Sequence, residues 1–263
     1  MTIGLSACIE LLFADEPDFV RRIARAAAAG FDGIEFWRWS DKDLDAVRRE
    51  AERAAVGVVA LCAEPFGELD LVDPGTHGAF LAGFERSCRA ANRVGARNVV
   101  VLAGYADPER ARESQRESLR EVLQAAAAIA ERHRVTLLLE PLSEADGRSG
   151  YFLHDTEEAM GIIAAVARPQ VRLLYDRYHT LRSGEATGYG LQHRRHLLGH
   201  VHLADVPGRH EPGTGPTDWR AELASLLGGY QGFVGLEYLP TTDPATVVDR
   251  LRPLIDAAQG TSS

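Results

Sequence analysis

Short runs of apolar residues alternate along this chain with longer amphipathic segments. Such uninterrupted apolar runs are typical of parallel strands that are covered on both faces. They predict strands over residues 3–9, 33–37, 57–63, 98–104, 135–140, 171–176, 200–205 and 233–238. The segments between them predict helices over residues 18–30, 76–94, 108–133, 217–227 and 243–258. Three more helices are predicted: one after Ser40 as N-cap, one from Asp155 and Thr156 to just before Pro169, and a less distinct one around 186–196.

Eight successive strand–helix units favour a closed barrel over an open, doubly wound sheet. No Gly-x-Gly-x-x-Gly fingerprint follows the first predicted strand, which weakens the case for a dinucleotide-binding fold. The 263 residues are close to the usual length of one such barrel, and no linker or low-complexity insert divides them. The sequence therefore predicts a single α/β domain over residues 1–263, a (β/α)₈ TIM barrel with parallel strands, whose last few residues are disordered.

Ionisable residues stand at the ends of the last four predicted strands. They are Glu140 in TLLLE, Asp176 in RLLYD, His202 in HVHL and Glu237 in FVGLE. The C-terminal ends of barrel strands meet at one mouth, and a buried charge there is costly unless it is paired or bound to a metal. Three carboxylates and one imidazole suit a divalent cation, with Mn²⁺ or Mg²⁺ favoured and Co²⁺ or Zn²⁺ as alternatives. His200 begins its predicted strand, so we place it at the end away from the chemistry.

Two of these carboxylates could move a proton. Glu140 and Glu237 belong to the fifth and eighth strands, which lie across the mouth from each other in a closed barrel. If both flank a substrate, they can act as a proton donor and acceptor, and a cation beside them could polarise a carbonyl and stabilise an enediolate. This chemistry suits aldose–ketose isomerisation or epimerisation next to a ketone. Taken singly, each glutamate could equally be a solvated loop residue or half of an ion pair.

Four further residues are candidates for substrate contacts. His179, three residues after Asp176, could orient the substrate, complete the metal shell or cap the loop between strand and helix. Arg209 lies in DVPGRHEPGTG, a loop that could fold over the mouth and pair with an anionic or hydroxylated substrate, or remain in solvent. Glu35 and Trp37 follow the second strand, where they could line a sugar-sized pocket or pack beneath a loop.

Composition narrows the choice of partners. Lys and Arg number 29 against 38 Asp and Glu, so the net charge is -9, which argues against nucleic acid as the main partner. No apolar run approaches the length of a membrane span, and no secretory leader is visible. Cys8, Cys62 and Cys88 have no metal-ligand spacing and an odd count, so we expect buried free thiols and a cytoplasmic protein acting on a small molecule.

At these residues the chain resembles the hydroxypyruvate isomerase-like group of the sugar isomerase/epimerase barrels, a superfamily that also contains endonuclease IV. The loop PGRHEPGTG is the most specific match, and the matching segments extend over nearly the whole chain. They are GFDGIEFW, LLLEPL, GYFLHDTEEA, YDRYH, HVHLADVPGRHEPGTG and GFVGLEY.

The resemblance implies a role for each candidate at the mouth. Metal ligands would be Glu140, Asp176, His202 and Glu237, with Glu140 and Glu237 also the acid/base couple, and His179 and Arg209 would contact substrate. Hydroxypyruvate isomerase tends to have glutamine where this chain has His202, whereas the ketose epimerases have histidine. The chain also reads EPLS where the family often reads EPLN, and GTGP where it often reads GTGE.

The resemblance thus implies an isomerase or epimerase of a small hydroxycarbonyl compound, of the ketose/aldose or hydroxypyruvate/tartronate-semialdehyde type, in a homodimer or homotetramer. Two alternatives stay open. An endonuclease IV-like phosphodiesterase would need more histidines near the strand ends than the first four strands supply, where Glu35 and Glu64 are the only ionisable candidates. A non-catalytic sugar-binding barrel would not need both Glu140 and Glu237.

Overall fold

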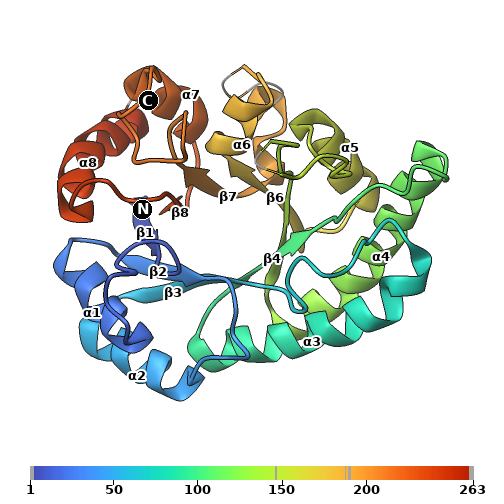
Figure 1. Ribbon diagram of the computed structural model, residues 1–263, viewed down its shortest axis with the longest axis horizontal. Helices are drawn as coiled ribbons and strands as arrows, with labels where there is room; N and C mark the ends of the chain where they lie inside the picture. The colour runs from blue at the N-terminus through green and yellow to red at the C-terminus, as the bar shows by residue number, and fades with distance from the viewer. Residues whose placement is uncertain (1–2, 146, 187, 189–190, 261–263) are drawn as a thin grey trace.

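The predicted closed barrel of parallel strands is confirmed by the computed structural model, which describes residues 3–145, 147–186, 188 and 191–260 (Figure 1). Each strand pairs in parallel with its neighbours in sequence, and the first pairs with the last to close the ring. The strands are β1 (Gly4–Cys8), β2 (Gly33–Phe36), β3 (Gly57–Cys62), β4 (Asn98–Leu102), β5 (Thr136–Glu140), β6 (Val171–Asp176), β7 (Leu198–Leu203) and β8 (Phe233–Leu236).

The helices surround the barrel (Figure 1). They are α1 (Phe19–Ala28), α2 (Leu44–Ala54), α3 (His77–Val94), α4 (Arg112–His133), α5 (Thr156–Val166), α6 (Arg177–Arg182), α7 (Trp219–Leu227) and α8 (Pro244–Gly260). The two ends of the chain meet, since the backbone N–H of Ile3 donates to Gln259 Oε1 at 3.2 Å. Residues 261–263, on which the expected terminal disorder falls, lie outside the described residues. No helix among the described residues is long and apolar enough to cross a membrane.

The prediction of Ser40 as the N-cap of the second helix is wrong. Asp43 caps α2, and its Oδ1 accepts hydrogen bonds from the backbone N–H groups of Asp45 and Ala46. The backbone N–H of Ser40 instead donates to Glu64 Oε1 at 3.0 Å, which ties this stretch to the loop after β3. The helix thus begins three residues later than a cap at Ser40 would place it, because the Asp43 side chain satisfies the first backbone N–H groups.

The prediction of a helix around residues 186–196 is also wrong for the described residues of this stretch, and residues 187, 189 and 190 lie outside them. The helix after β6 is α6, which begins immediately at the strand end, with Asp176 as its cap accepting from the backbone N–H of Tyr178 at 2.8 Å. It stops after six residues, and Gly184 follows with a φ of 73°, a conformation that ends a helix. Short 3₁₀ turns at Leu191–His193 and Arg195–Leu197 complete the connection to β7.

Strand β7 begins two residues earlier than predicted, at Leu198 instead of residue 200. The register between β6 and β7 is irregular here, because Leu173 pairs with Leu198 whereas the next residue, Leu174, pairs with His200, so that β7 has one extra residue, Gly199. His200 is thus inside the strand, and the expectation that it begins the strand, away from the chemistry, is wrong. His200 and His202 are two residues apart, so both face the interior of the barrel.

The interior of the barrel is apolar on one side and polar on the other. Leu138 and Leu174 belong to a small apolar cluster with side chains of β3 and β4, separate from the main core between strands and helices. On the opposite side the buried residues include Ser6, Glu35 and His200, from β1, β2 and β7. All three cysteines are free and buried, as expected.

A buried ion pair ties α6 to α7. Arg177 donates from Nε and Nη2 to the two carboxylate oxygens of Glu222, each at 2.8 Å, and both side chains are buried. This bidentate geometry is the strong form of the interaction. It anchors the short helix that carries His179.

We predict that Glu222→Ala lowers the free energy of unfolding by about 3 kcal/mol, because it leaves the buried Arg177 charge without its carboxylate partner. Urea unfolding followed by circular dichroism measures the change. The matched control is Glu52→Ala, which removes an exposed pair with Arg48 on α2 and should cost less than about 1 kcal/mol. Equal decreases in the free energy of unfolding of the two variants would contradict the anchoring role of the Arg177–Glu222 pair.

Candidate active site

Four side chains predicted as metal ligands converge at the C-terminal mouth of the barrel. Glu140 and Asp176 end β5 and β6, His202 lies one residue before the end of β7, and Glu237 directly follows β8. All four are buried, and one potential ligand atom from each lies within 4.8 Å of the others. None of the four is therefore a solvated loop residue, whereas the other alternative for a single glutamate, half of an ion pair, does apply to Glu237, which pairs with Arg209.

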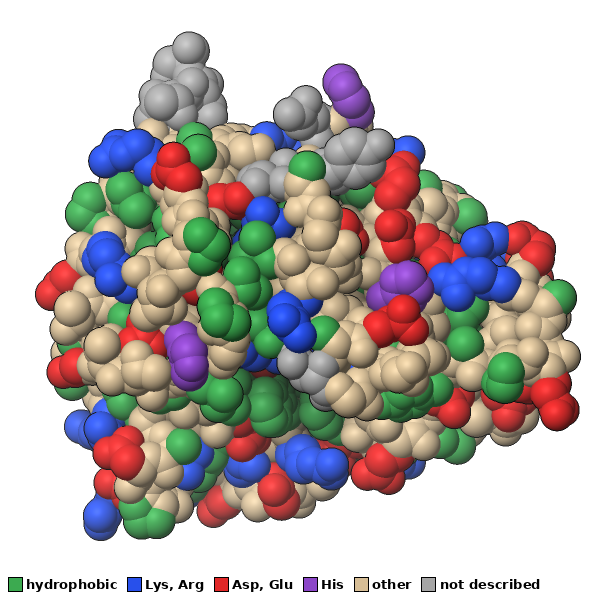
Figure 2. Space-filling view, turned by 45° about the horizontal axis from the view of Figure 1, so that its top comes forward, with side chains coloured by type: hydrophobic (Ala, Val, Ile, Leu, Met, Phe, Trp, Pro, Cys, Tyr) green, Lys and Arg blue, Asp and Glu red, His purple; other side chains and the backbone are tan. Residues whose placement is uncertain are grey.

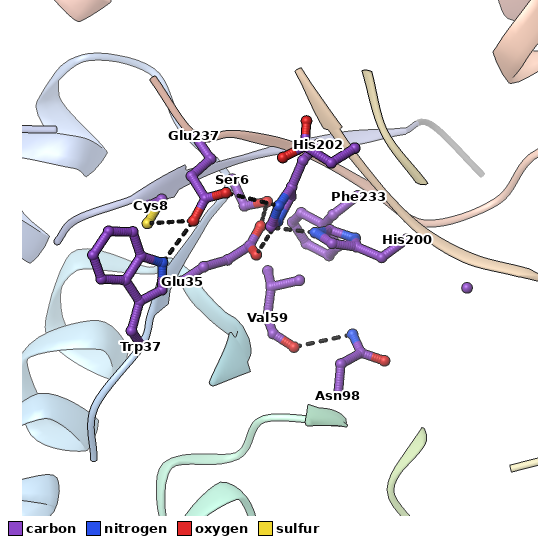
Figure 3. A network of polar contacts seen from close by, with 12 residues as sticks. Ser6, Cys8, Glu35, Trp37, Val59, Asn98, His200, His202, Phe233 and Glu237 are labelled. Atoms are coloured by element: carbon purple, nitrogen blue, oxygen red, sulfur yellow. Dashed lines mark hydrogen bonds and ion pairs between the residues drawn. The ribbon is translucent and has the colours of Figure 1, made fainter. Parts of the chain in front are cut away.

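Glu237 is the most heavily contacted of the four (Figure 3). Its Oε1 accepts from the indole N–H of Trp37 at 2.6 Å and from Cys8 Sγ at 3.6 Å. Its Oε2 is paired with Arg209 and lies 3.3 Å from His202 Nδ1. Burial by itself would raise the pKa of Glu237, but Arg209 and His202 outweigh it and hold that pKa well below its ordinary value.

The pKa of Glu140 is shifted in the opposite direction to that of Glu237. Within the described part of the chain, its carboxylate makes no hydrogen bond or ion pair. Burial and the nearby charge of Glu237 raise the pKa of Glu140 to about 8. The two glutamates therefore form an unequal pair, in which one is ionised and the other holds a proton at neutral pH.

Arg209 lies over this cluster, so the loop after β7 does fold over the mouth. Its Nη2 is 3.0 Å from Asp176 Oδ2 and also contacts the Glu237 carboxylate, while its Nε donates to the backbone carbonyl of Glu237 at 3.2 Å. The guanidinium stands 5.1 Å from the ring centroid of Tyr178, a cation–π contact. These charged partners raise the pKa of Arg209 against the effect of its burial.

The loop that carries Arg209 is held from inside by Asp205, which is fully buried. Its carboxylate oxygens accept hydrogen bonds from the backbone N–H groups of Val206, Gly213 and Gly215, from the Thr217 hydroxyl and from the Trp219 indole. A Cβ at Gly215 would lie 2.0 Å from the Val206 carbonyl oxygen, so only glycine fits there. The glycines therefore allow the loop to fold around the Asp205 carboxylate.

His179 lies in the first turn of α6 and presents a nitrogen to the mouth. Its Nδ1 accepts from the backbone N–H of Ser143 at 3.2 Å, so the proton of the neutral ring is on Nε2. Burial lowers the pKa of His179 to about 4 and keeps the ring neutral. The Nε2 atom is buried, lies 3.7 Å from Asp176 Oδ2 and has no hydrogen-bond partner among the described residues. It can therefore donate to a bound molecule.

Glu35 and Trp37, predicted together as substrate contacts, lie at different depths. Trp37 is at the mouth, stacked on Phe66 with ring centroids 6.1 Å apart. Glu35 lies within β2 rather than after it, and its carboxylate is bonded to His200 and His202. Burial would raise the pKa of Glu35, but these two histidines outweigh it and hold that pKa below its usual range.

A cavity of about 310 Å³ opens beside these residues, a size suited to a small molecule. On the face shown in Figure 2, acidic and basic side chains are interspersed, with hydrophobic side chains gathered in a hollow. Sequence reasoning missed several residues that line the cavity, namely Phe66, Tyr105, Arg148 and Tyr151. They lie in loops after β3, β4 and β5, where no periodic pattern marks a side chain as facing the mouth.

The side chains present fit a divalent cation. His202 Nε2 is 2.9 Å from Glu35 Oε2, whereas its Nδ1 is buried and has no hydrogen-bond partner within the described residues. This nitrogen belongs to the cluster of Glu140, Asp176 and Glu237. Three carboxylates and one neutral imidazole nitrogen are a suitable donor set for such an ion.

A closed parallel barrel with its ionisable groups at the C-terminal mouth defines the class of (β/α)₈ proteins that keep their site in the loops after the strands. Within this class, the chain belongs to the xylose isomerase-like TIM barrel family, whose model matches residues 23–258. The resemblance drawn from the sequence motifs is thereby confirmed.

Relatives and solved structures extend this comparison. The chain is 31% identical to hydroxypyruvate isomerase of Escherichia coli K12, over 91% of this chain and 95% of the relative. It is 30% identical to 2-oxo-tetronate isomerase of Cupriavidus necator, over 92% and 95% of the two chains. The crystal structure of an AP endonuclease, family 2, from Brucella melitensis superposes with a TM-score of 0.87 at 26% identity, covering 96% of this chain and 99% of the other.

We predict that Mn²⁺ binding at about pH 7 releases at least one proton, because the cation must displace the protons that Glu140 and His202 hold. Burial and Glu237 raise the pKa of Glu140 to about 8. Burial would lower the pKa of His202, but Glu35 and Glu237 outweigh it and hold that pKa well above its usual value, so the free protein carries both protons at about pH 7. Calorimetric titration in buffers of different ionisation enthalpy counts the protons. Binding that releases no proton at about pH 7 would contradict the assigned ionisation states of both groups.

Proposed function

We propose that the protein is a metal-dependent isomerase or epimerase that interconverts small hydroxycarbonyl compounds by proton transfer through an enediolate. The observation that carries the proposal is geometric: two buried glutamates, Glu140 and Glu237, from different strand ends, offer carboxylates to one potential cation site. The names of the Escherichia coli and Cupriavidus necator relatives, both isomerases, support the same reaction class.

In this proposal the two glutamates have different roles in the proton transfer. Glu237, ionised in this site, removes the proton from the carbon next to the carbonyl. Glu140, which gives up its own proton when a cation binds, takes up another from solvent and returns it to the neighbouring carbon in an isomerisation or to the opposite face of the same carbon in an epimerisation. The electron pair of the broken C–H bond forms the enediolate and returns to carbon when that proton arrives. In the isomerisation the hydroxyl proton of the substrate also moves from one oxygen of the intermediate to the other. The two carboxyl groups then regain their starting states by exchange with solvent.

The other residues at the mouth bind and orient the substrate. The Nε2–H group of His179 donates a hydrogen bond to a substrate oxygen, and the guanidinium of Arg209 favours an anionic or hydroxylated group. Trp37 walls the cavity while its indole N–H fixes the Glu237 carboxylate. A divalent cation, with Mn²⁺ or Mg²⁺ favoured over Co²⁺ or Zn²⁺, would be held by Glu140, Asp176, His202 and Glu237 and would polarise the substrate carbonyl.

A phosphodiesterase reaction is less well supported, despite the structural similarity to an AP endonuclease. The potential ligand set at the mouth contains a single histidine among the described residues, and the net charge of -9 disfavours a nucleic-acid substrate. A nicking assay on abasic DNA separates the two reactions. If the protein only binds sugars, Glu237→Gln should bind them as the wild type does, and neither protein should show catalytic activity.

The first functional prediction concerns hydrogen exchange. The Mn²⁺-loaded protein should exchange hydrogen with solvent at the carbon next to the carbonyl in at least one member of a panel that contains hydroxypyruvate, 2-oxo-tetronate and small ketoses. Incubation in deuterium oxide followed by NMR spectroscopy measures the exchange. Absence of exchange across the whole panel, in protein shown to bind the metal, would rule out the proposed reaction class.

The second functional prediction concerns the two glutamates. Glu140→Gln and Glu237→Gln should each reduce turnover by about 10²–10⁴-fold, the usual contribution of a general acid or base. The control is Glu158→Gln, which changes a glutamate on α5, outside the barrel, that pairs with Arg112 and Arg116. Steady-state rates on the substrate found by exchange provide the comparison, and a tenfold or smaller effect of both site variants would refute the division of roles.

A further inference from the structure

His202 belongs to two buried clusters of ionisable side chains. One is the ligand set at the mouth, and the other, one layer deeper in the barrel, contains Glu35 and His200. Figure 3 shows the deeper group below Glu237, with dashed contacts that join the carboxylate of Glu35 to both imidazole rings. Ser6, on the neighbouring strand β1, completes it. The mechanism proposed above uses none of the deeper residues.

The contacts in this deeper layer are specific to individual atoms. Glu35 Oε2 lies 2.9 Å from His202 Nε2, and Glu35 Oε1 lies 2.9 Å from His200 Nε2. The Ser6 hydroxyl donates to the same Oε1. An ionised carboxylate only accepts hydrogen bonds, so both imidazole rings must donate to it from Nε2. All four side chains are buried.

This pairing decides which nitrogen of His202 is available as a ligand. When a cation displaces the second ring proton, the proton on Nε2 stays with Glu35 and the neutral ring has its lone pair on Nδ1. Nδ1 is the atom that has no hydrogen-bond partner within the described residues and lies 3.3 Å from Glu237 Oε2. A carboxylate that fixes the tautomer and direction of a metal-binding histidine is a recurrent arrangement in metal sites.

The backbone is also adapted to this contact. Gly235 of β8 is the register partner of His202. A Cβ at this glycine would stand 2.5 Å from Glu35 Oε1 and 2.6 Å from His202 Cδ2, closer than such atoms approach. Its φ is not in the left-handed region, so the requirement for glycine here is one of space. The neighbouring strand thus leaves the room that the Glu35–His202 pair occupies.

We propose that Glu35 is a positioning residue that holds His202 with its Nδ1 lone pair directed at the cation site, and that Glu35 itself contacts neither substrate nor cation. Ser6 and His200 in turn hold Glu35. The inference rests on the cation site of the proposed function but not on any particular substrate. It assigns Glu35, which also lines the cavity, a different role from the substrate-binding one predicted from the sequence, and it gives His200 a role.

The variant Glu35→Gln tests the proposal through the chemistry of one atom. Ser6 and His200 both donate to Oε1, so the single carbonyl oxygen of glutamine should take that position. The amide NH₂ then faces His202 Nε2, which must become an acceptor, and the ring proton moves to Nδ1. We expect Mn²⁺ affinity, measured by calorimetry, to fall by about 10–100-fold. The melting temperature, measured in the absence of metal, reports separately on folding.

Co²⁺ provides a spectroscopic readout that a purely structural role would not change. The N–H proton of an imidazole bound to Co²⁺ gives a strongly shifted, solvent-exchangeable NMR signal. The wild-type protein should show this signal for His202 Nε2–H, and Glu35→Gln saturated with Co²⁺ should lose it. Unchanged affinity together with an unchanged signal would overturn the proposal.

A second pair of variants keeps the test valid if Glu35→Gln folds poorly. Gly235→Ala leaves every polar group in place but crowds the Glu35–His202 contact, so it should also weaken Mn²⁺ binding. Gly161→Ala on α5 is the matched control, because an added Cβ there meets nothing within 4 Å. Equal Mn²⁺ affinity in these two variants would count against the positioning role.

Metal stoichiometry separates the remaining outcomes. One Mn²⁺ per chain supports the proposal, whereas two, with one lost in Glu35→Gln, would make Glu35 a ligand and overturn it. No binding to the wild-type protein would overturn both this inference and the cation site. Tight binding by the wild type without hydrogen exchange on any substrate would refute the proposed function alone, and the role of Glu35 would stand.

Discussion

Three carboxylates and an imidazole are buried together at one mouth of the barrel, and the rest of the site depends on how their charges are compensated. Charges removed from water are stable only with partners of opposite sign or with strong hydrogen bonds. Here Arg209 contacts Asp176 and Glu237, while Glu140 keeps its proton instead. A divalent cation would meet the same need, and the cluster is therefore equipped both to bind one and to move a proton.

The uneven filling of the barrel allows this arrangement. One side of the interior is packed with an apolar cluster, of which Ala60, Cys62 and Val100 also line the cavity. The other side has a polar layer in which Glu35, His200 and Ser6 are bonded to one another. Because an apolar environment strengthens electrostatic interactions, the two sides act together on the mouth.

The sequence predicted the parts of this structure in which one physical signal dominates. Apolar runs that end in Glu140, Asp176 and Glu237 predicted both the strands and the position of the mouth. In each of these strands, the residues that lead up to the charged one are apolar on both faces. The same reasoning failed for β7, where His200 interrupts an apolar run and resembles a strand end. A polar residue that faces the interior of a barrel cannot be distinguished from a boundary by local pattern. Its partner, Glu35, is 165 residues away in sequence.

The most direct test of this account is a crystal structure of the Mn²⁺-soaked protein with anomalous diffraction data at a wavelength sensitive to manganese. We expect one anomalous peak per chain at the mouth, about 2–2.5 Å from a carboxylate oxygen of Glu140, Asp176 and Glu237 and from Nδ1 of His202. Arg209 should then have left the carboxylates that it contacts here. A peak elsewhere, or a His202 bound through Nε2, would contradict the account.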